Sequence, residues 1–385
     1  MEKEFVRLDF YCDSVRDGTH DTPKPTEQGM PLVTSKAIRG GKVFLDECYL
    51  ISQKDFDKIN KRSLVEKWDV LMTMIGTVGR LLLVKDTPHY AIKNIALFKI
   101  GNELKAKWLY YYLLMDSVQN YFEMIANGTS QHFIGLGHMR KLKIPNITQS
   151  SGKIVEILST YDTLIENNTK RIRLLEKMAE NLYKEWFVRF RFPGHENVEM
   201  ENGLPKGWKR GSLSDVCEFK RGKNITSSEM EEGNVPVISA GLEPSGYHSC
   251  SNVRGVNVTM SSSGANAGYI AIHYSDIWAA DCSYIKEATT DNIYYVYELL
   301  NNIRTVINNF QRGAAQPHVY PKDVNRIKLI LPSKDLMRKA NRRLEIMHKE
   351  IYNLQKQNSL LARQRDLLLP RLMSGKLEVK EELLE

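Results

Sequence analysis

Cysteine is scarce in this sequence, and the cysteines stand far apart. There are five in 385 residues, and no two form a C-x-x-C pair. His248 and Cys250 lie close together, but two ligands do not make a structural zinc site, and the nine histidines show no zinc-type pairing. The sequence therefore predicts no disulfide framework and no metal site, and its cores are expected to fold without either.

Long apolar runs and targeting segments are also missing. The longest apolar stretch, residues 70–84, is interrupted by Gly76, Gly79 and Arg80 and is too short to cross a bilayer. The first four residues, MEKE, are polar and charged, unlike the start of a secretory signal. We therefore expect a cytoplasmic protein with no membrane partner.

The motifs that carry catalytic chemistry are absent as well. No Gly-Lys pair has the flanking residues of a phosphate-binding loop, and residues 261–264 (SSSG) lack the nucleophile-elbow frame. Residues 133–137 (FIGLG) fit the F-x-G-x-G pattern of adenine methyltransferases, but no Asn-Pro-Pro-aromatic or Asp-Pro-Pro-aromatic tetrapeptide accompanies them. The sequence thus predicts no catalytic residue here. The alternative of a self-sufficient methyltransferase would require the isolated chain to bind S-adenosylmethionine.

What the sequence does contain is a repeat. Residues 128–145 begin with GTSQH and end with RKLKIP, and residues 313–332 begin with GAAQPH and end with NRIKLILP. Each segment is followed by a long stretch with regularly spaced apolar residues. Because self-similarity constrains the architecture before any local motif does, the sequence predicts a duplicated module.

The two stretches after the repeats predict long amphipathic helices, the second running until Pro370 interrupts it. Apolar residues at alternating steps of three and four are typical of coiled coils, so we expect the helices to pair antiparallel. The alternative is that each helix packs on its own domain. The predicted seam residues are Leu158, Tyr161, Ile165, Asn168, Ile172, Leu175 and Leu182 in the first helix, and Leu344, Met347, Ile351, Leu354, Asn358, Leu361 and Leu368 in the second.

Stretches rich in Gly, Ser, Asn and short β-branched runs flank the first helix and indicate mixed α/β domains. We expect a first domain over residues 1–150, a central helix over 151–194, a second domain over 195–335 and a C-terminal helix over 336–385. The predicted fold class is α+β: two globular mixed α/β domains separated by two long antiparallel coiled-coil helices, with a pseudo-two-fold repeat.

Polar and basic turns recur in both predicted domains, and the net charge is +8. Such turns suit DNA, because Arg and Lys bind phosphates whereas Gln, Asn, Ser and Arg reach base edges. Each residue by itself is also typical of a solvated surface. The candidates in the first domain are Arg16, His20, Lys24, Lys36, Arg39, Lys42, Thr77, Arg80, Ser130 and Gln131. Those in the second are Arg221, Lys223, Asn224, Ser262, Asn266, Gln316 and His318.

Together these features resemble the specificity subunits of type I restriction-modification enzymes. Residues 158–165 (LSTYDTLI), 175–188 and 191–194 resemble the family's central conserved region, and residues 365–377 (RDLLLPRLMSGKL) resemble its C-terminal conserved end. The other segments that carry the resemblance are 204–208 (LPKGW), similar to the beginning of a second target-recognition domain, and 17–20 (DGTH) with 76–79 (GTVG), similar to parts of a first.

The resemblance implies that each domain binds one half of a split double-stranded DNA target and that the helices set the unread gap. It also implies docking of two methyltransferase subunits, with motor-nuclease subunits joining them. S-adenosylmethionine, ATP and Mg would then be bound by these partner subunits, and this chain would bind no cofactor. Composition leaves open another class, a non-catalytic coiled-coil adaptor with two ligand-binding modules and no DNA sequence specificity.

Overall fold

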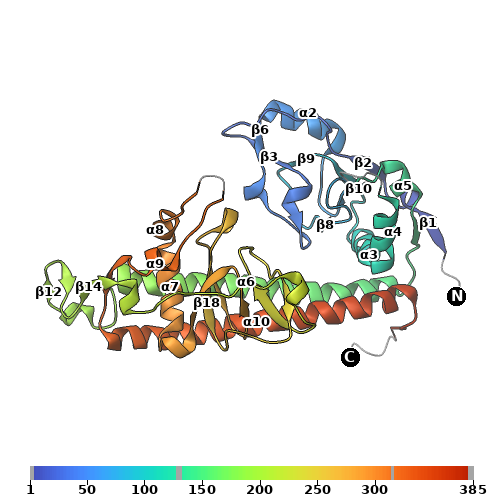
Figure 1. Ribbon diagram of the computed structural model, residues 1–385. Helices are drawn as coiled ribbons and strands as arrows, with labels where there is room; N and C mark the ends of the chain where they lie inside the picture. The colour runs from blue at the N-terminus through green and yellow to red at the C-terminus, as the bar shows by residue number, and fades with distance from the viewer. Residues whose placement is uncertain (1–3, 127–131, 314–315, 380–385) are drawn as a thin grey trace. The chain divides into compact units, whose positions relative to one another are not determined.

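The chain forms two compact units (Figure 1). The computed structural model describes residues 4–126, 132–313 and 316–379. The first unit contains Met1–Ile165 and Ser359–Glu385, and the second contains Glu166–Asn358. Two long helices, α6 (Ser151–Tyr183) and α10 (Lys334–Ser374), therefore each contribute one part to each unit.

The first unit is built around a four-stranded antiparallel sheet of order β2-β10-β7-β8 and a three-stranded sheet of order β6-β3-β9. Its strands are β1 (Phe5–Arg7), β2 (Ser14–Asp17), β3 (Met30–Val33), β4 (Ile38–Arg39), β5 (Lys42–Val43), β6 (Leu50–Ile51), β7 (Val70–Thr73), β8 (Leu81–Leu83), β9 (Ala91–Ile92), β10 (Ile95–Lys99) and β11 (Lys143–Pro145). Its helices, besides parts of α6 and α10, are α1 (Leu8–Tyr11), α2 (Gln53–Ser63), α3 (Glu103–Leu114), α4 (Asp116–Ile125) and α5 (Leu136–Lys141).

The core of the first unit lies between the four-stranded sheet and its helices. β7 and β8 are apolar at nearly every position, and all their residues are buried, as expected for strands covered on both faces. Trp108 and Tyr111 of α3 and Phe122 of α4 are almost completely buried in this core. Leu158 from α6 and Leu372 from α10 belong to the same cluster.

The second unit has the same construction. Its strands are β12 (Met200–Glu201), β13 (Leu204–Pro205), β14 (Lys209–Ser212), β15 (Lys220–Arg221), β16 (Val235–Ile238), β17 (Gly246–His248), β18 (Asn257–Ser261), β19 (Ile270–His273), β20 (Trp278–Ala279), β21 (Cys282–Lys286) and β22 (Lys328–Leu331). Its helices, besides parts of α6 and α10, are α7 (Ile293–Asn302), α8 (Arg304–Asn308) and α9 (Pro321–Val324).

The main sheets of the two units correspond strand for strand, whereas among the described residues the β4–β5 and β12–β13 pairs each occur in one unit only. The sheet β15-β21-β18-β19 corresponds to β2-β10-β7-β8, and β17-β16-β20 corresponds to β6-β3-β9, with one antiparallel and one parallel pair in each. β14 pairs with β22 as β1 pairs with β11. The predicted duplication and the α+β fold class are therefore confirmed.

Individual backbone contacts repeat as well. The Gly18 amide donates to the carbonyl oxygen of Ile95 at 2.9 Å, and the Gly222 amide donates to that of Cys282 at 2.8 Å. A β-carbon at Gly18 would stand 2.2 Å from the Ile92 carbonyl oxygen, and one at Gly222 would meet a carbonyl oxygen at 2.4 Å. Because a side chain does not fit in either place, glycine fixes residues 17–20 and 221–224 as equivalent loops.

The first unit also carries a helix, α2, between β6 and β7. Ser52 caps it, since its hydroxyl accepts from the Asp55 amide at 3.1 Å. In the second unit the corresponding segment, residues 249–256, is described throughout and contains no helix. α2 therefore supplies the first unit with side chains that the second unit must obtain elsewhere.

The long helices pair antiparallel within the second unit. Asn168 Nδ2 donates to Gln357 Oε1 at 3.4 Å, and Arg171 donates to Glu350 at 2.8 Å, so residue numbers rise on one helix as they fall on the other. Leu158, Asn168, Leu344, Ile351 and Leu354 are buried. The remaining predicted seam residues are partly buried, namely Tyr161, Ile165, Ile172, Leu175, Leu182, Met347, Asn358, Leu361 and Leu368.

Packing on the domains, which the sequence left open as an alternative, occurs alongside helix pairing. Ala179 of α6 and Trp186, which follows the end of α6, lie in the core of the second unit together with Leu344 of α10. The prediction that Pro370 interrupts the second helix is wrong, because α10 continues to Ser374. Proline removes one backbone hydrogen bond, but the flanking Leu369 is buried in the first core and holds the last turn in place.

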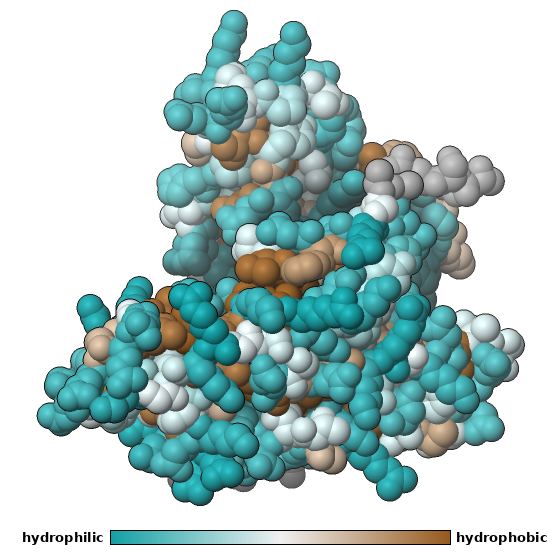
Figure 2. All heavy atoms as spheres, turned by 60° about the vertical axis from the view of Figure 1, so that its left-hand side comes forward, coloured by the Kyte–Doolittle hydropathy of each residue, from teal (hydrophilic) through white to brown (hydrophobic). Residues whose placement is uncertain are grey.

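Hydrophilic residues cover most of the face shown in Figure 2, and hydrophobic residues reach it only in limited areas. Among the residues that the structure describes, no helix combines the length and apolar composition needed to cross a bilayer.

In the first unit the helices are also joined by a polar network. Arg365 of α10 donates to Asp162 Oδ1 of α6 at 2.5 Å, and the Tyr111 hydroxyl of α3 donates to Asp162 Oδ2 at 2.6 Å. Both members of the ion pair are largely buried, which strengthens their interaction and makes the loss of either one costly.

Removing Asp162 should therefore destabilise the chain. Asp162→Ala leaves Arg365 and Tyr111 without their shared acceptor, and we expect a loss of roughly 2 kcal/mol in the free energy of unfolding. Asp366 also bonds Arg365 but is largely exposed, so Asp366→Ala should cost less than about 0.5 kcal/mol. Urea unfolding of the full chain measures both, and equal losses would contradict the role given to Asp162.

A histidine in the second unit should make stability depend on pH. Burial lowers the pKa of His273 to about 4, while its Nε2 lies 2.8 Å from the Thr259 hydroxyl. The unfolded side chain has a pKa of about 6.5 and so binds protons first as the pH falls. Stability should therefore drop by about 2 kcal/mol between pH 7 and pH 5 through this group. In urea unfolding at both pH values, His273→Gln should reduce that drop, whereas the same change at exposed His89 should not.

Candidate nucleic-acid interface

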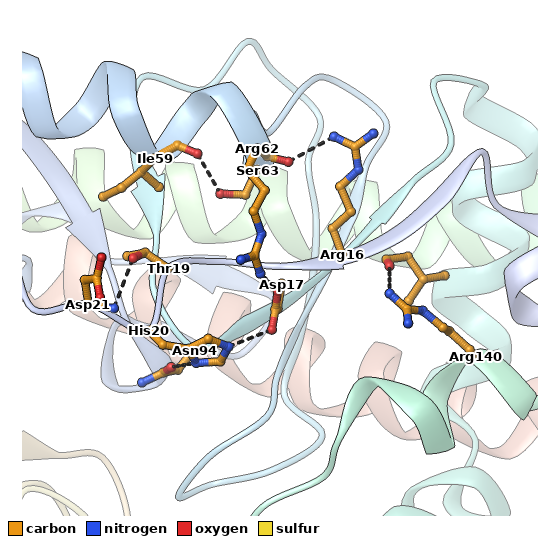
Figure 3. Close-up of polar contacts among 11 residues, drawn as sticks. Arg16, Asp17, Thr19, His20, Asp21, Ile59, Arg62, Ser63, Asn94 and Arg140 are labelled. Carbon is orange, nitrogen blue, oxygen red and sulfur yellow. Dashed lines mark hydrogen bonds and ion pairs between the residues drawn. The ribbon is translucent and has the colours of Figure 1, made fainter.

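In the first unit, the loop after β2 brings several polar side chains together (Figure 3). His20 Nε2 lies 2.8 Å from Asp17 Oδ2, and its Nδ1 lies 2.8 Å from Asn94 Oδ1. Arg62, pointing down from α2, forms an ion pair with the other oxygen of Asp17. Asp17 is almost buried, whereas His20 and Arg62 are exposed. The exposed side chains of Arg62 and His20 thus meet on one almost buried carboxylate.

The candidate Arg16 lies beside this loop on β2. Its guanidinium donates to the Arg62 carbonyl oxygen, in the last turn of α2, at 2.9 Å. Arg16 is exposed, and so is Lys24 farther along the chain. The structure therefore places Arg16 and His20 in one cluster, with Lys24 exposed on the segment that follows.

The β4–β5 hairpin carries two candidates, Arg39 and Lys42, and Lys36 lies in the turn just before it. Arg39 forms an ion pair with Glu47, and its guanidinium lies 3.8 Å from the centre of the Phe44 ring. The hydrogen bond from Arg39 lowers the pKa of the Glu47 carboxyl below its ordinary value. Lys36 is exposed and Lys42 is partly exposed. Because an exposed ion pair contributes little to stability, Arg39 can exchange Glu47 for another anion at small cost.

The turn after β7 holds Thr77 and Arg80. The Thr73 hydroxyl donates to the Thr77 carbonyl oxygen at 2.5 Å and accepts from the Arg80 amide at 3.0 Å. The Arg80 guanidinium donates to the Ile38 carbonyl oxygen at 3.2 Å. Arg80 thus ties this turn to the β4–β5 hairpin, and exposed Thr77 is the residue the turn presents. Ser130 and Gln131 lie outside the described residues.

In the second unit, β15 ends at Arg221, and the loop after it presents Lys223 and Asn224; all three residues are exposed. The register of β15 on β21 makes Arg221 the equivalent of Asp17, because both precede the close-packed glycine. Asp281 takes the place of Asn94, one residue before the strand. Arg221 lies 3.9 Å from Asp281, so the charges at these two equivalent positions differ between the units.

The turn after β18 needs a correction. Ser262 is only 4% exposed, and its amide and carbonyl groups bond Asp281 and Val319. It occupies the position of Met74, which is equally buried and bonds Ile134 in the same way. Ser262 therefore supports the turn from inside, and its side chain does not reach the surface.

The other candidates of this region are nearer the surface. Asn266 is partly exposed and lies at the limit of a hydrogen bond, 3.5 Å, from the Ala240 carbonyl oxygen. Gln316 is exposed, whereas His318 stacks on Tyr320 with their planes 20° apart. The His318 backbone pairs with Ser263 just as the Phe133 backbone pairs with Ile75.

Two basic residues at this interface, Arg62 and Lys220, were not predicted from the sequence. Arg62 reaches the loop only because α2 packs over it, which no local pattern indicates. Lys220 is the equivalent of Arg16, since each pairs with the central strand one position before the loop. An alignment of the two halves that matches Gly18 with Gly222 would have indicated Lys220. Both glycines pack against backbone carbonyl groups in the same way, so they fix the register of this alignment.

In the comparison with known proteins, both units match the same family model. Residues 18–177 and 205–362 match the model of the type I restriction modification DNA specificity domain. The type I restriction enzyme MjaIX specificity subunit of Methanocaldococcus jannaschii is 25% identical over 347 residues, which cover 82% of this chain and 79% of that protein. The HindI specificity subunit of Haemophilus influenzae is 22% identical, covering 86% of this chain and 91% of that protein.

A solved structure shares the fold. The crystal structure of the S subunit of a type I restriction-modification system from M. genitalium has a TM-score of 0.59 and 21% sequence identity, covering 97% of this chain and 96% of that one. The first matched stretch begins directly after β2 and extends into α6, and the second begins at the last residue of β13 and extends into α10. Because these two stretches make up more than half of the sequence, the chain belongs to the type I restriction-modification DNA specificity family.

Proposed function

We propose that this chain is the DNA-recognition subunit of a type I restriction-modification system and that each unit reads one half of a bipartite target. The observation that carries this proposal is the duplicated scaffold with different side chains at equivalent exposed positions. Three equivalent positions carry different residues: Arg16 corresponds to Lys220, Thr19 to Lys223, and His20 to Asn224. Equivalent backbones with different donors and acceptors suit two unlike half-sites.

The long helices would set the unread gap and dock two methyltransferase subunits. Their outward faces support a docking role, because large apolar side chains remain exposed there. These are Leu164, Leu174 and Met178 on α6, and Ile346, Leu360 and Leu367 on α10. Motor-nuclease subunits would join through the same assembly, and S-adenosylmethionine, ATP and Mg would be bound by these partners. In the cytoplasm this chain would recognise the DNA target, and the partner subunits would carry out the catalytic reactions.

A deletion that shortens both helices tests the gap-setting role. Residues 168–174 and 351–357 face each other, so removing both keeps the seam in phase. Seven residues correspond to about 10 Å of helix, or roughly three base pairs, so the gap should shorten by that amount. Methylation sequencing of a host that co-expresses the methyltransferase subunit measures gap and half-sites together.

The matched control for that experiment removes residues 168–174 alone. It leaves α6 one heptad shorter than its partner, so the two helices can no longer pair in register while closing both cores, and methylation should be abolished. New half-sites in the double deletion would contradict the division of roles between helices and units. Methylation without any sequence preference would favour the adaptor interpretation instead.

The repeated glutamines offer a test of half-site reading. Gln316→Ala and Gln131→Ala should each weaken recognition of one half-site and leave the other unchanged, because each belongs to a different unit. Gln364→Ala, an exposed glutamine of α10, is the control and should change neither. The measurement is the methylation rate of duplexes with single substitutions in either half-site. Equal effects on both halves would count against base contact by these side chains.

A further inference from the structure

Each unit holds an exposed arginine against an aspartate at the same place in the fold. In the first unit the pair is Arg62 and Asp17, and in the second it is Arg221 and Asp281. Asp17 and Arg221 occupy one equivalent position, the last residue before the close-packed glycine. The shared position thus holds the acid in the first unit and the base in the second, and in each unit the partner comes from a different element.

The sources of the two arginines explain this difference. Where the second unit has Arg221 on its strand, the first unit has an acid, and it draws its arginine from α2 instead. The second unit has no helix at the corresponding segment, which is fully described, and it draws its acid from residue 281, the equivalent of Asn94. Sequence alignment cannot pair these arginines, because they come from different elements.

Both aspartates are held by further bonds. Asp17 accepts at one oxygen from Arg62, and its other oxygen lies 2.8 Å from His20, as Figure 3 shows. Asp281 accepts from the Ser263 hydroxyl at 2.5 Å. Their side chains are 10% and 32% exposed, whereas those of Arg62 and Arg221 are 63% and 56% exposed. Each carboxylate is therefore fixed, and each guanidinium keeps free donors toward solvent.

Stability does not account for this arrangement. An ion pair with so exposed a partner contributes little, because water screens it. Orientation accounts for it better, since a guanidinium held on one side presents its remaining N–H groups as a planar fork. That fork matches the O6 and N7 acceptors of guanine in the major groove, and a flexible arginine would have to be ordered first.

The space beside the first pair is open. Arg62 and His20 border a hollow of about 420 Å³ between α2 and the loop after β2. Its rim also carries Lys58 together with Asp21 and Asp55, so the hollow has little net charge. A balanced charge disfavours a phosphate, which needs an excess of cations, and suits the edge of a base.

We infer that Arg62 and Arg221 are the equivalent base-reading residues of the two units, each contacting a guanine, and that Asp17 and Asp281 are their positioning residues. This inference rests on the proposed DNA-recognition function. It assigns each half-site one G·C pair whose recognition depends on a single arginine.

The experiment uses this chain in complex with its methyltransferase subunit. The substrate is a duplex library that carries all four base pairs at every position of the wild-type motif, and the readout is the relative methylation rate. Arg62→Lys and Arg221→Lys keep the charge but lose the fork. Each should reduce the preference for G·C at one position of one half-site by roughly 5- to 150-fold, with rates on other positions unchanged.

The positioning residues give a second readout. Asp17→Asn and Asp281→Asn should reduce the preference for the same G·C pair as the lysine variant of their own unit. The reduction should be smaller than in that lysine variant. Arg7→Lys and Arg189→Lys are controls, because both are exposed, ion-paired arginines away from the loops, and neither should change any preference. Thermal unfolding of each variant separates misfolding from altered recognition.

Several results would overturn the inference. A uniform loss over all sequences would assign the arginines to phosphates, and an unchanged preference would remove them from the interface. A recognised half-site that contains no G·C pair would also overturn the inference. A wild-type complex that methylates no bipartite motif would instead contradict the proposed function itself, so the two failures can be told apart.

Discussion

Each of the two cores is closed by segments of both long helices. In the first unit, Leu158 of α6 and Leu372 of α10 are buried among residues of the sheet and of α3. In the second, Ala179 of α6 and Leu344 of α10 take the same role. Burying each leucine contributes about 1.5–3 kcal/mol, so neither unit is complete without residues from distant parts of the sequence. A slip of either helix by a few residues would withdraw side chains from a core as well as from the seam.

The polar residues on the seam make that slip costlier still. Asn168 bonds Gln357, and Asn358 Nδ2 lies 3.4 Å from the Thr169 hydroxyl, while Arg365 bonds Asp162. Polar groups inside a coiled coil cost stability in comparison with leucine, but the bonds that these groups make form in one register only. The contacts across the helix pair thus fix its register.

The periodic parts of this fold could be predicted from the sequence, whereas the positions set by tertiary packing could not. Heptad spacing is local, so every predicted seam residue is buried or partly buried. Pro370 was misjudged because burial of the neighbouring Leu369 outweighs one missing hydrogen bond. Ser262 was misjudged because a serine-rich turn looks polar, although this position is the buried one that Met74 fills in the first unit.

The interface divides in the same way. Exposed loop residues such as His20 and Lys223 follow from the turn chemistry, but Arg62 becomes visible only when α2 is placed over β2. At Gly18 and Gly222 the backbone packs so closely against a neighbouring segment that no side chain would fit. The shape of each loop therefore does not depend on which side chains the loop exposes. Recognition can then change by substitution of exposed side chains, or by a helix inserted between strands, without disturbing either core. Two copies of one scaffold can for this reason differ in their exposed side chains while each keeps its own core.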